Sequence, residues 1–372
     1  MTIGILSMRN MDSAPRIIRE IKTLEANFEL VLIGNSNQVG KHQVHSIYSF
    51  RNLYDKLISR MDRIGKRKKL RYSKLTRFIL QKKIQLLIIH EPMFFPLAIH
   101  LKEKYGLKIA FNAHEYYPLE FEDIPKWLST EGAYFSHLYQ HYLHQFDLFI
   151  NVCESIRLKC LEEFNIDSIV IPNAAFESKI PPSTNEQFPI RLIHHGALLP
   201  GRKIEKMISI VQEVGENFTL DIMGVPNAHA MDYYQLLENL CSKTNNVRLI
   251  NPVKFNEIVP FINQYDIGIY LLEPSNFNHF NALPNKLFEF IQAKLAIIVS
   301  PTPEMGNLVS KYQIGKIADD FSTNSMVEIL KAITQKDIAF YKENSKKAAR
   351  IENAENYQRI FLEQILSLTK EY

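Results

Sequence analysis

The sequence predicts an α/β protein made of two doubly wound domains, and three observations support this. Its 372 residues exceed what one hydrophobic core normally organises. Short apolar runs alternate with longer stretches of helical period along the whole chain, as expected for parallel sheets with crossover helices. Residues 176–189 interrupt this alternation with Pro181, Pro182 and Pro189 among turn-forming residues, which indicates a linker.

The first domain is expected over residues 1–175. It opens with a strand at Ile3–Ser7 and continues with a helix over Ala14–Asn27, where apolar residues recur at helical spacing. Its further expected strands are Phe28–Gly34, Ile84–His90, Leu107–Asn112, Phe146–Val152 and Ile169–Pro172. These runs are apolar on both faces, which is typical of strands buried within a parallel sheet.

The second domain is expected over residues 190–352. Its expected strands are Arg191–His195, Phe218–Met223, Val247–Ile250, Asp266–Leu272, Leu295–Ser300 and Ile314–Ile317. The tail over residues 353–372 carries one helical stripe, formed by Tyr357, Ile360, Phe361, Ile365 and Leu368. A helix with such a stripe must bury it, so we expect the tail to dock on a folded domain.

The composition is that of a soluble globular protein. The chain is 46% hydrophobic and 23% charged, with 13 Gly and 17 Pro, which excludes collagen-like and disordered classes. Its three cysteines include no Cys-x-x-Cys pair, so neither a disulfide framework nor a zinc site is expected. No apolar run reaches the roughly 18 residues of a membrane span, and the start lacks the basic region of a signal peptide. We therefore expect a cytoplasmic protein.

Several common cofactor and metal signatures are missing. No Gly-x-Gly occurs, which disfavours a dinucleotide-binding dehydrogenase. Gly34–Lys41 resembles a P-loop, but five residues separate its glycines and His42 replaces the magnesium-binding hydroxyl residue. Asp-x-Asp, His-Glu-x-x-His and Gly-x-Ser-x-Gly are also missing. We expect no cofactor and no metal, and chemistry that uses scattered side chains.

The most informative local pattern is NALPNKLFEFIQAK, at Asn281–Lys294. Pro284 suits the first turn of a helix, where its missing N–H costs nothing. Lys286 and Glu289, three residues apart, then share one face. A lysine at a helix N-terminus favours a phosphate, and a carboxylate one turn later can accept two ribose hydroxyls. A local Lys286–Glu289 ion pair on a surface helix is the open alternative.

The segment ALPNKLFEFIQAKLAIIVS resembles the C-terminal-domain signature of bacterial family-four glycosyltransferases, in the variant that carries Pro-Asn-Lys within a Glu-x7-Glu element. In that family the second Glu binds the nucleotide ribose, and it matches Glu289. The first Glu contacts the donor sugar and falls at Asn281, which leaves that contact neutral. The resemblance also implies nucleotide-sugar contacts at Val253, Leu283 and Asn285.

A second stretch, LIHHGALLPGRKIEKMI at Leu192–Ile208, resembles the start of the same family's donor domain. The resemblance implies that Gly196 gives the backbone room near the diphosphate and that Arg202 holds it. A second basic residue, common after the glycine, is replaced here by Ala197, so we expect Lys286 to take its place. A solvated Arg202 at a helix start is the alternative.

A third stretch, FNAHEYYPLEFED at Phe111–Asp123, follows an expected parallel strand at the edge where open α/β sheets bind ligands. It resembles the family's Asp-Ala-His-Glu-Tyr motif, with Asn112 at the position of the Asp. The resemblance implies that His114 contacts the transferred sugar, with Glu115 nearby. A capped or core histidine is the alternative.

A basic segment over residues 60–83 holds eleven Lys or Arg against one acid, Asp62. Leu75, Phe78 and Ile79 form an inward stripe, and the outer faces keep the cations Lys74, Arg77, Lys82 and Lys83. Two interpretations of this segment remain open: its cations form a solvated helix face, or they contact an anionic membrane surface. Nucleic acid is disfavoured, because the net charge is only +4 and no nucleic-acid-binding motif accompanies the patch.

Together the resemblances cover nearly the whole chain and imply the GT-B fold, with two Rossmann-like domains facing across a cleft and the last helix returning to the N-terminal domain. They imply a retaining, metal-independent glycosyltransferase in bacterial capsule, exopolysaccharide or lipopolysaccharide synthesis. Its donor would be a UDP- or GDP-sugar and its acceptor a saccharide or lipid-linked saccharide, in the cytoplasm or at the inner face of the plasma membrane. A non-catalytic GT-B partner subunit and a sugar-nucleotide epimerase remain as alternatives. Asn281 weighs against the epimerase, which needs paired carboxylates.

Overall fold

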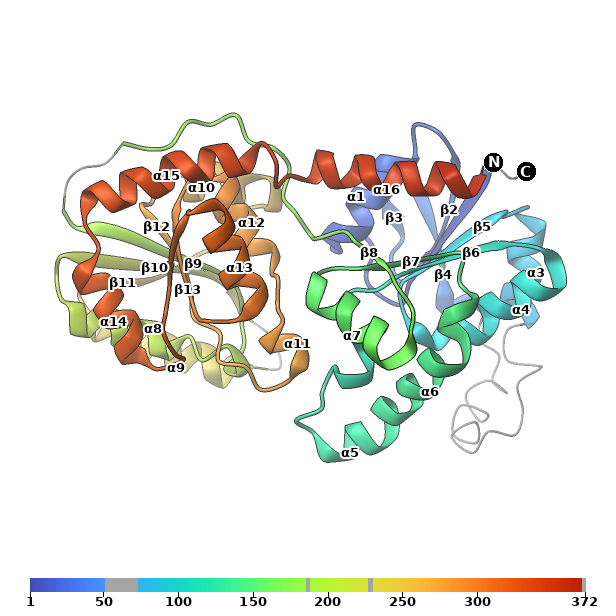
Figure 1. Cartoon of the computed structure of the whole chain (residues 1–372), viewed down its shortest axis with the longest axis horizontal. Helices are drawn as coiled ribbons and strands as arrows, with labels where there is room; N and C mark the ends of the chain where they lie inside the picture. The colour runs from blue at the N-terminus through green and yellow to red at the C-terminus, as the bar shows by residue number, and fades with distance from the viewer. Residues whose placement is uncertain (51–72, 185–187, 227–229, 370–372) are drawn as a thin grey trace. The chain divides into compact units, whose positions relative to one another are not determined.

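The protein is described by a computed structural model that covers residues 1–50, 73–184, 188–226 and 230–369 (Figure 1). The chain divides into two compact units. Unit 1 comprises Met1–Pro172 and Gln358–Tyr372, and unit 2 comprises Asn173–Tyr357. Each unit has its own sheet with helices on both faces.

The sheet of unit 1 has the strand order β3-β4-β2-β1-β5-β6-β7-β8. Its strands are β1 (Thr2–Leu6), β2 (Glu29–Gly34), β3 (Gln38–Val39), β4 (His42–Ser46), β5 (Leu86–Ile89), β6 (Lys108–Asn112), β7 (Leu148–Asn151) and β8 (Ile169–Val170). All neighbours pair in parallel except β3 and β4. The six strands expected in this half are confirmed. Strands β3 and β4 were not predicted, because their short polar sequences contain no apolar run.

The helices of unit 1 follow local sequence signals. They are α1 (Pro15–Leu24), α3 (Ser73–Gln81), α4 (Phe95–Tyr105), α5 (Pro125–Trp127), α6 (Ala133–Tyr142) and α7 (Glu154–Phe164). Helix α1 begins with Pro15 in its first turn, and α4 ends at Gly106, whose φ of 72° lies in the left-handed region. The inward stripe of α3 is confirmed, since Leu75 and Ile79 are buried. Residues 60–72 of the basic segment lie outside the described residues.

The sheet of unit 2 is parallel throughout and has the order β11-β10-β9-β12-β13-β14. Its strands are β9 (Ile190–Leu198), β10 (Phe218–Pro226), β11 (Val247–Ile250), β12 (Ile267–Tyr270), β13 (Ala296–Val299) and β14 (Gly315–Ile317). All six were expected from the sequence and are confirmed. Strand β9 is longer than predicted, because its pairing with β10 continues to Leu198.

The helices of unit 2 pack on both faces of this sheet (Figure 1). They are α8 (Glu205–Val214), α9 (Met231–Ser242), α10 (Ile258–Ile262), α11 (Phe277–Phe280), α12 (Asn285–Gln292), α13 (Pro303–Tyr312), α14 (Thr323–Ala332) and α15 (Gln335–Ala349). Successive strand residues serve opposite faces: Leu192 packs with α8, α9 and α14, whereas Ile193 packs with α10, α12 and α13. The two apolar layers hold β9 and α12, and with them the candidate site, in fixed positions.

The chain changes unit twice. Residues 173–184 form no helix or strand, and Ala174 and Ala175 pack in the core of unit 2, so the unit begins before the sequence-based boundary at 175. Helix α16 (Ala354–Thr369) begins in unit 2, and from Gln358 onward it belongs to unit 1. There Phe361 and Ile365 are buried, which confirms that the striped tail docks on a folded domain.

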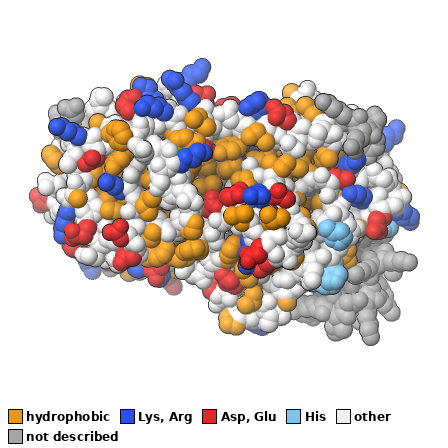
Figure 2. All heavy atoms as spheres, in the orientation of Figure 1, with side chains coloured by type: hydrophobic (Ala, Val, Ile, Leu, Met, Phe, Trp, Pro, Cys, Tyr) orange, Lys and Arg blue, Asp and Glu red, His pale blue; other side chains and the backbone are white. Residues whose placement is uncertain are grey.

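No helix among the described residues is both long and apolar enough to span a membrane. On the face shown in Figure 2, Lys and Arg side chains lie among Asp and Glu side chains and apolar patches.

Candidate functional site

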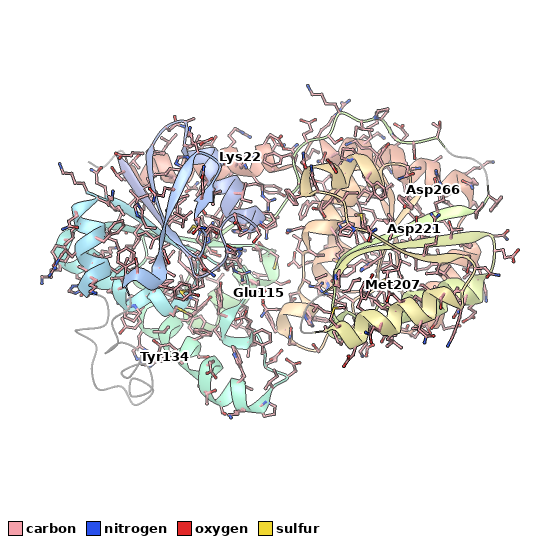
Figure 3. All side chains as sticks on the ribbon, turned by 180° about the vertical axis from the view of Figure 1, so that it is seen from behind. Lys22, Glu115, Tyr134, Met207, Asp221 and Asp266 are labelled. Atoms are coloured by element: carbon pink, nitrogen blue, oxygen red, sulfur yellow. The ribbon has the colours of Figure 1, made fainter. Side chains whose placement is uncertain are left out.

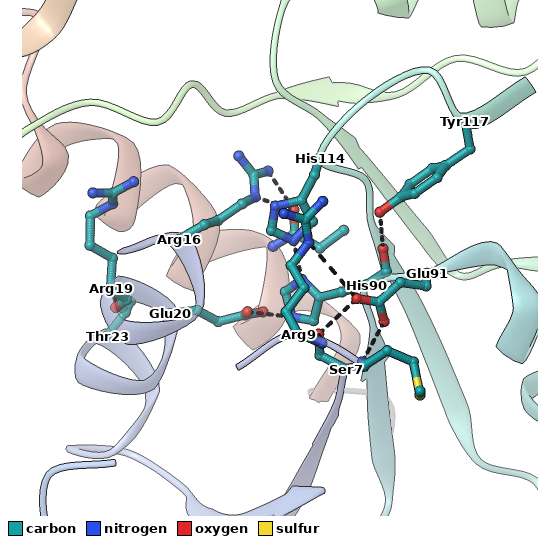
Figure 4. A network of polar contacts seen from close by, with 12 residues as sticks. Ser7, Arg9, Arg16, Arg19, Glu20, Thr23, His90, Glu91, His114 and Tyr117 are labelled. Atoms are coloured by element: carbon teal, nitrogen blue, oxygen red, sulfur yellow. Dashed lines mark hydrogen bonds and ion pairs between the residues drawn. The ribbon is translucent and has the colours of Figure 1, made fainter. Parts of the chain in front are cut away.

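Polar side chains gather at the carboxyl ends of the parallel strands in each unit, where open α/β sheets bind ligands. In unit 2 the group comprises His195, Gly196, Arg202, Tyr270, Lys286 and Glu289, and we call it the Lys286 cluster. In unit 1 the group comprises Arg9, Arg16, Glu20, His90 and His114, and we call it the His114 cluster (Figure 4).

Lys286 is a buried cation at the start of α12. Its side chain is only 8% exposed, and its Nζ lies 4.1 Å from the centre of the Tyr270 ring. It makes no hydrogen bond or ion pair with any residue that the structure describes. Burial lowers the pKa of Lys286 well below its usual value, and the nearby Arg202 lowers it further. The alternative of a surface ion pair with Glu289 is therefore wrong.

The start of α12 differs by one residue from the sequence prediction. Pro284 has an extended backbone and precedes the helix, so Asn285 is its first residue and Lys286 its second. The N–H groups of Asn285 and Lys286 have no carbonyl partner within the helix, whereas the Leu287 N–H already donates to the Pro284 carbonyl at 3.1 Å. A cation and free backbone donors thus lie together at the positive end of the helix, which favours an anion.

Gly196 lets Lys286 approach strand β9. Its φ of +129° is a conformation that other residues rarely adopt, and a Cβ atom there would lie 3.2 Å from Lys286 Nζ. Ala197, the next residue, supplies no cation. In the resembled family a basic residue follows this glycine. Here Lys286 lies beside the glycine instead.

Arg202 joins the same cluster through Tyr270. Its Nη1 donates a hydrogen bond to the Tyr270 hydroxyl, so the alternative of a freely solvated side chain is wrong. Tyr270 is the last residue of β12, is fully buried, and stacks on His194 with ring centres 5.7 Å apart. The sequence reasoning missed Tyr270, although its place at the end of an expected strand was a usable signal.

Glu289 is buried one turn after Lys286, on the same helix. Its Oε2 lies 3.3 Å from Nε2 of His195, near the end of β9. Burial, with Lys286 nearby, lowers the pKa of His195 to about 3, so this ring is neutral at neutral pH. Glu289 Oε2 and His195 Nε2 are close, but their geometry is not that of a hydrogen bond. The sequence reasoning did not include His195.

The other residues assigned to the nucleotide sugar lie before Lys286 or near α12. Asn281 is buried directly after α11, and its Nδ2 donates to the carbonyl of Phe277 at 2.9 Å. Leu283 and Val253 pack at the edge of the apolar cluster beneath α12, and Asn285 is half-buried at the first position of that helix. Arg202 and Glu289 both act electrostatically on Lys286, whereas no such link to Lys286 is seen for these four residues.

Two other buried carboxylates of unit 2, Asp221 and Asp266, are labelled in Figure 3, and both have structural partners. Asp221 accepts bonds from Arg248 Nη2 at 2.7 Å and from the Tyr265 hydroxyl at 2.6 Å. Asp266 pairs with Lys342 Nζ at 3.2 Å. Both carboxylates hold elements of the fold together, in contrast to the unpaired Lys286.

His114 follows β6 in unit 1 and is half-buried. Its Nε2 lies 2.9 Å from Nδ1 of His90, and Nε2 of His90 lies 2.9 Å from Glu20 Oε2. Burial lowers the pKa of His114 well below its usual value, and the nearby His90 and arginines lower it further. The ring is therefore neutral at neutral pH and joined to a polar chain that the sequence reasoning did not foresee.

Asn112 holds a buried arginine. Its Oδ1 accepts a bond from Arg16 Nε at 2.8 Å, and Arg16 Nη1 donates to the carbonyl of Ile171 at 2.8 Å. Burial lowers the pKa of Arg16 to about 10. The residue at the position of the family's Asp thus binds a guanidinium as a neutral acceptor.

The loop after β1 is fixed by Glu91. Its carboxylate accepts bonds from Ser7 Oγ at 2.8 Å and from the Met8 N–H at 3.0 Å.

Glu115 is half-buried beside His114 in the chain. Burial, followed by repulsion from Glu115, raises the pKa of Glu120 to about 7. The sequence reasoning missed this carboxyl group, whose pKa depends on its surroundings.

No group of three or more His, Cys, Asp or Glu side chains in the described part of the chain could hold a metal ion.

No protein-family model matches the chain, and no curated protein matches its sequence. Solved structures match it over its whole length. Sucrose-phosphate synthase from Thermosynechococcus elongatus superposes with a TM-score of 0.76 at 10% identity and 100% coverage of both chains. HepE from Anabaena, solved with UDP, gives 0.71 at 12% identity, with 99% of this chain and 100% of that chain covered. The chain has the GT-B fold.

A third GT-B structure, the lipopolysaccharide outer core galactosyltransferase WaaB, gives a TM-score of 0.66 at 11% identity, with 99% of both chains covered. The structural neighbours of this chain are thus GT-B glycosyltransferases. This agrees with the fold that the sequence resemblance implied.

Proposed function

We propose that the chain is a retaining glycosyltransferase of the family-four type, which moves a sugar from a UDP- or GDP-sugar to a hydroxyl acceptor. The observation that carries the proposal is Lys286, a buried lysine with no hydrogen-bond or ion-pair partner among the described residues, at the start of α12 and beside Gly196. Burying a charge without a partner is costly, so a protein that keeps one there has a use for it. An anionic ligand supplies the missing partner.

In the proposed mechanism the Lys286 cluster binds the nucleotide. Lys286, Arg202 and the first N–H groups of α12 neutralise the diphosphate, which gains charge as the bond to the sugar breaks. Glu289 accepts hydrogen bonds from the ribose hydroxyls. Because cationic groups are already in place, this mechanism needs no metal.

The His114 cluster would serve the transferred sugar. We assign His114 and Glu115 to contacts with the sugar, and Asn281 to a neutral contact in place of the family's first Glu. In the retaining mechanism of the resembled family the leaving phosphate takes the acceptor proton, so no separate base is assigned. Retention in this chain rests on that resemblance.

The proposed biological role is bacterial surface polysaccharide synthesis. WaaB, whose fold this chain shares, is a lipopolysaccharide galactosyltransferase, and HepE was solved with UDP. The acceptor would then be a saccharide or lipid-linked saccharide, reached in the cytoplasm or at the inner face of the plasma membrane. Lys74, Arg77, Lys82 and Lys83 are exposed around α3 and could rest on anionic lipid.

The test is a thermal-shift screen of the full chain with UDP, GDP and their sugars, followed by hydrolysis and transfer assays on each stabilising donor. A bound ligand at about 100 times its dissociation constant stabilises by roughly 2.7 kcal/mol. We expect transfer to persist in EDTA. Stabilisation by none of these compounds would contradict the proposal. Loss of transfer in EDTA with recovery in Mg²⁺ would contradict its metal independence.

A further inference from the structure

We propose that Glu20 and His90 set the tautomer of His114, so that His114 Nδ1 faces the substrate as a hydrogen-bond acceptor for a sugar hydroxyl. This inference rests on the proposed function and specifies which substrate group the His114 cluster recognises. Glu20 and His90 are positioning residues in this scheme, because they act through His114.

The three side chains form a chain across unit 1 (Figure 4). Glu20 lies on α1, His90 directly after β5, and His114 after β6. Glu20 and His90 are 4% and 0% exposed, so water does not compete for their contacts. The separations are 2.9 Å from Glu20 Oε2 to His90 Nε2 and 2.9 Å from His90 Nδ1 to His114 Nε2.

The positions of the protons along the series from Glu20 through His90 to His114 follow from the buried end of the series, Glu20. The Glu20 oxygen lies 2.9 Å from His90 Nε2, off the line of a straight hydrogen bond. A carboxylate oxygen at this distance repels a bare nitrogen lone pair and favours a proton on His90 Nε2. In the proposed arrangement His90 carries a single proton, on Nε2, and its Nδ1 lone pair accepts the Nε2–H of His114. This leaves His114 Nδ1 without a proton.

The outer nitrogen of His114 is available for a ligand. Among the described residues none bonds to His114 Nδ1. Arg9, Arg16 and Arg19 lie close enough to oppose a positive charge on the ring, and burial opposes it more strongly. The neutral ring therefore offers one lone pair to a hydroxyl donor.

The other charged groups around the cluster have partners of their own. Arg16 is bound to Asn112 and to the carbonyl of Ile171. Glu91 accepts bonds from Ser7 and Met8 and approaches Arg9 Nε at 4.0 Å. The Tyr117 hydroxyl donates to the carbonyl of His90 at 2.8 Å, which fixes the backbone of the middle residue. Glu20 is thus the carboxylate that faces His90.

The first experiment is nitrogen NMR of the full chain labelled at histidine, with the His114 signals assigned from a His114→Gln variant. We expect a neutral ring with the proton on Nε2 and a bare Nδ1 at about pH 7. A proton on Nδ1 would overturn the inference. This readout needs no substrate, so it separates failure of the inference from failure of the proposed transferase activity.

The second experiment is Glu20→Gln, which keeps shape but presents both a donor and an acceptor to His90. We expect His114 to become a mixture of tautomers and the turnover of sugar transfer to fall about tenfold, with nucleoside diphosphate affinity unchanged. Glu352→Gln is the matched control. Glu352 is an equally buried carboxylate in unit 2, where it accepts a bond from the Tyr312 hydroxyl, and its change should alter neither the tautomer nor transfer.

Thermal unfolding of both variants checks that each is folded. An unchanged His114 tautomer in Glu20→Gln would overturn the inference, as would equal losses of transfer in Glu20→Gln and Glu352→Gln.

Discussion

Replacing Lys286 by methionine should stabilise the ligand-free protein and at the same time weaken nucleoside diphosphate binding. The two side chains have similar length, so the buried stem keeps its packing. The change removes a contact with the Tyr270 ring, which costs about 1 kcal/mol. It also removes a buried charge that has no hydrogen-bond or ion-pair partner among the described residues, and whose desolvation costs several kcal/mol. We expect a net gain of about 1–2 kcal/mol in the free energy of unfolding.

The size of this stability gain depends on pH. Burial lowers the pKa of Lys286 below the ordinary value of 10.5, so between the two values the folded protein binds fewer protons than the unfolded chain. The stability of the wild-type protein then rises with pH through that window. The advantage of the methionine variant should therefore be largest at low pH and shrink as the pH approaches 10.

Binding should change in the opposite direction. A hydrogen bond to a charged group contributes about 1.5–3 kcal/mol. Its loss should raise the dissociation constant for UDP or GDP by roughly 10- to 150-fold. Nucleoside binding should stay the same, because a nucleoside carries no phosphate. Denaturant unfolding and isothermal titration calorimetry measure the two effects.

Lys294→Met is the matched control, since Lys294 is also buried and lies just after the same helix. Its Nζ donates to the carbonyls of Ser178 and Gln292, each at 3.0 Å. Its removal leaves these carbonyls without a partner and should destabilise by about 1–3 kcal/mol, with no change in nucleotide affinity. The reasoning is refuted if Lys286→Met destabilises as much as Lys294→Met, or if it weakens UDP and uridine equally.

Three further predictions concern single carboxyl or histidine groups. Glu289→Gln should weaken uridine and UDP binding by a similar factor of about 10, and a calorimetric loss confined to UDP would speak against a ribose contact. His114→Ala should lower transfer by about 100-fold, or roughly 2.7 kcal/mol, at unchanged UDP affinity, and near wild-type turnover would contradict this. Glu120→Gln should be more stabilising at pH 8 than at pH 5 by about 1 kcal/mol, after allowance for partial exposure. The pKa of the wild-type carboxyl is raised to about 7, so the folded wild-type protein loses stability as the pH rises from the ordinary value of 4.5 through 7. An equal difference in unfolding free energy between variant and wild type at both pH values would disprove the shift.

The sequence alone predicted most of the framework. Twelve strands were predicted and all are present, because buried parallel strands are continuous apolar runs that contrast with helical spacing. Strands β3 and β4 were not predicted. The sequence of β4, HQVHS, is mostly polar, and this segment becomes a strand through its pairing with β2. The start of α12 was placed within one residue, because proline restricts where a helix can begin.

Part of the candidate site was also readable from the sequence. Lys286 and Glu289 share a helix, so their spacing puts them on one face before any tertiary structure is considered. The sequence did not show whether Lys286 and Glu289 pair with each other. The structure shows that both are buried and that no ion pair joins them.

Only the tertiary structure brought distant residues into contact. Tyr270 meets Arg202 across 68 positions of the chain, and His90 meets His114 across 24. Glu20 lies on α1, which connects β1 to β2, and it comes within 2.9 Å of His90, which follows β5, the neighbour of β1 in the sheet. Spacing along a chain predicts which side chains share one helix or strand, because backbone geometry is local. Contacts between elements depend on how the sheet orders its strands, and the charge state of His114 or Lys286 depends on the burial that this packing creates.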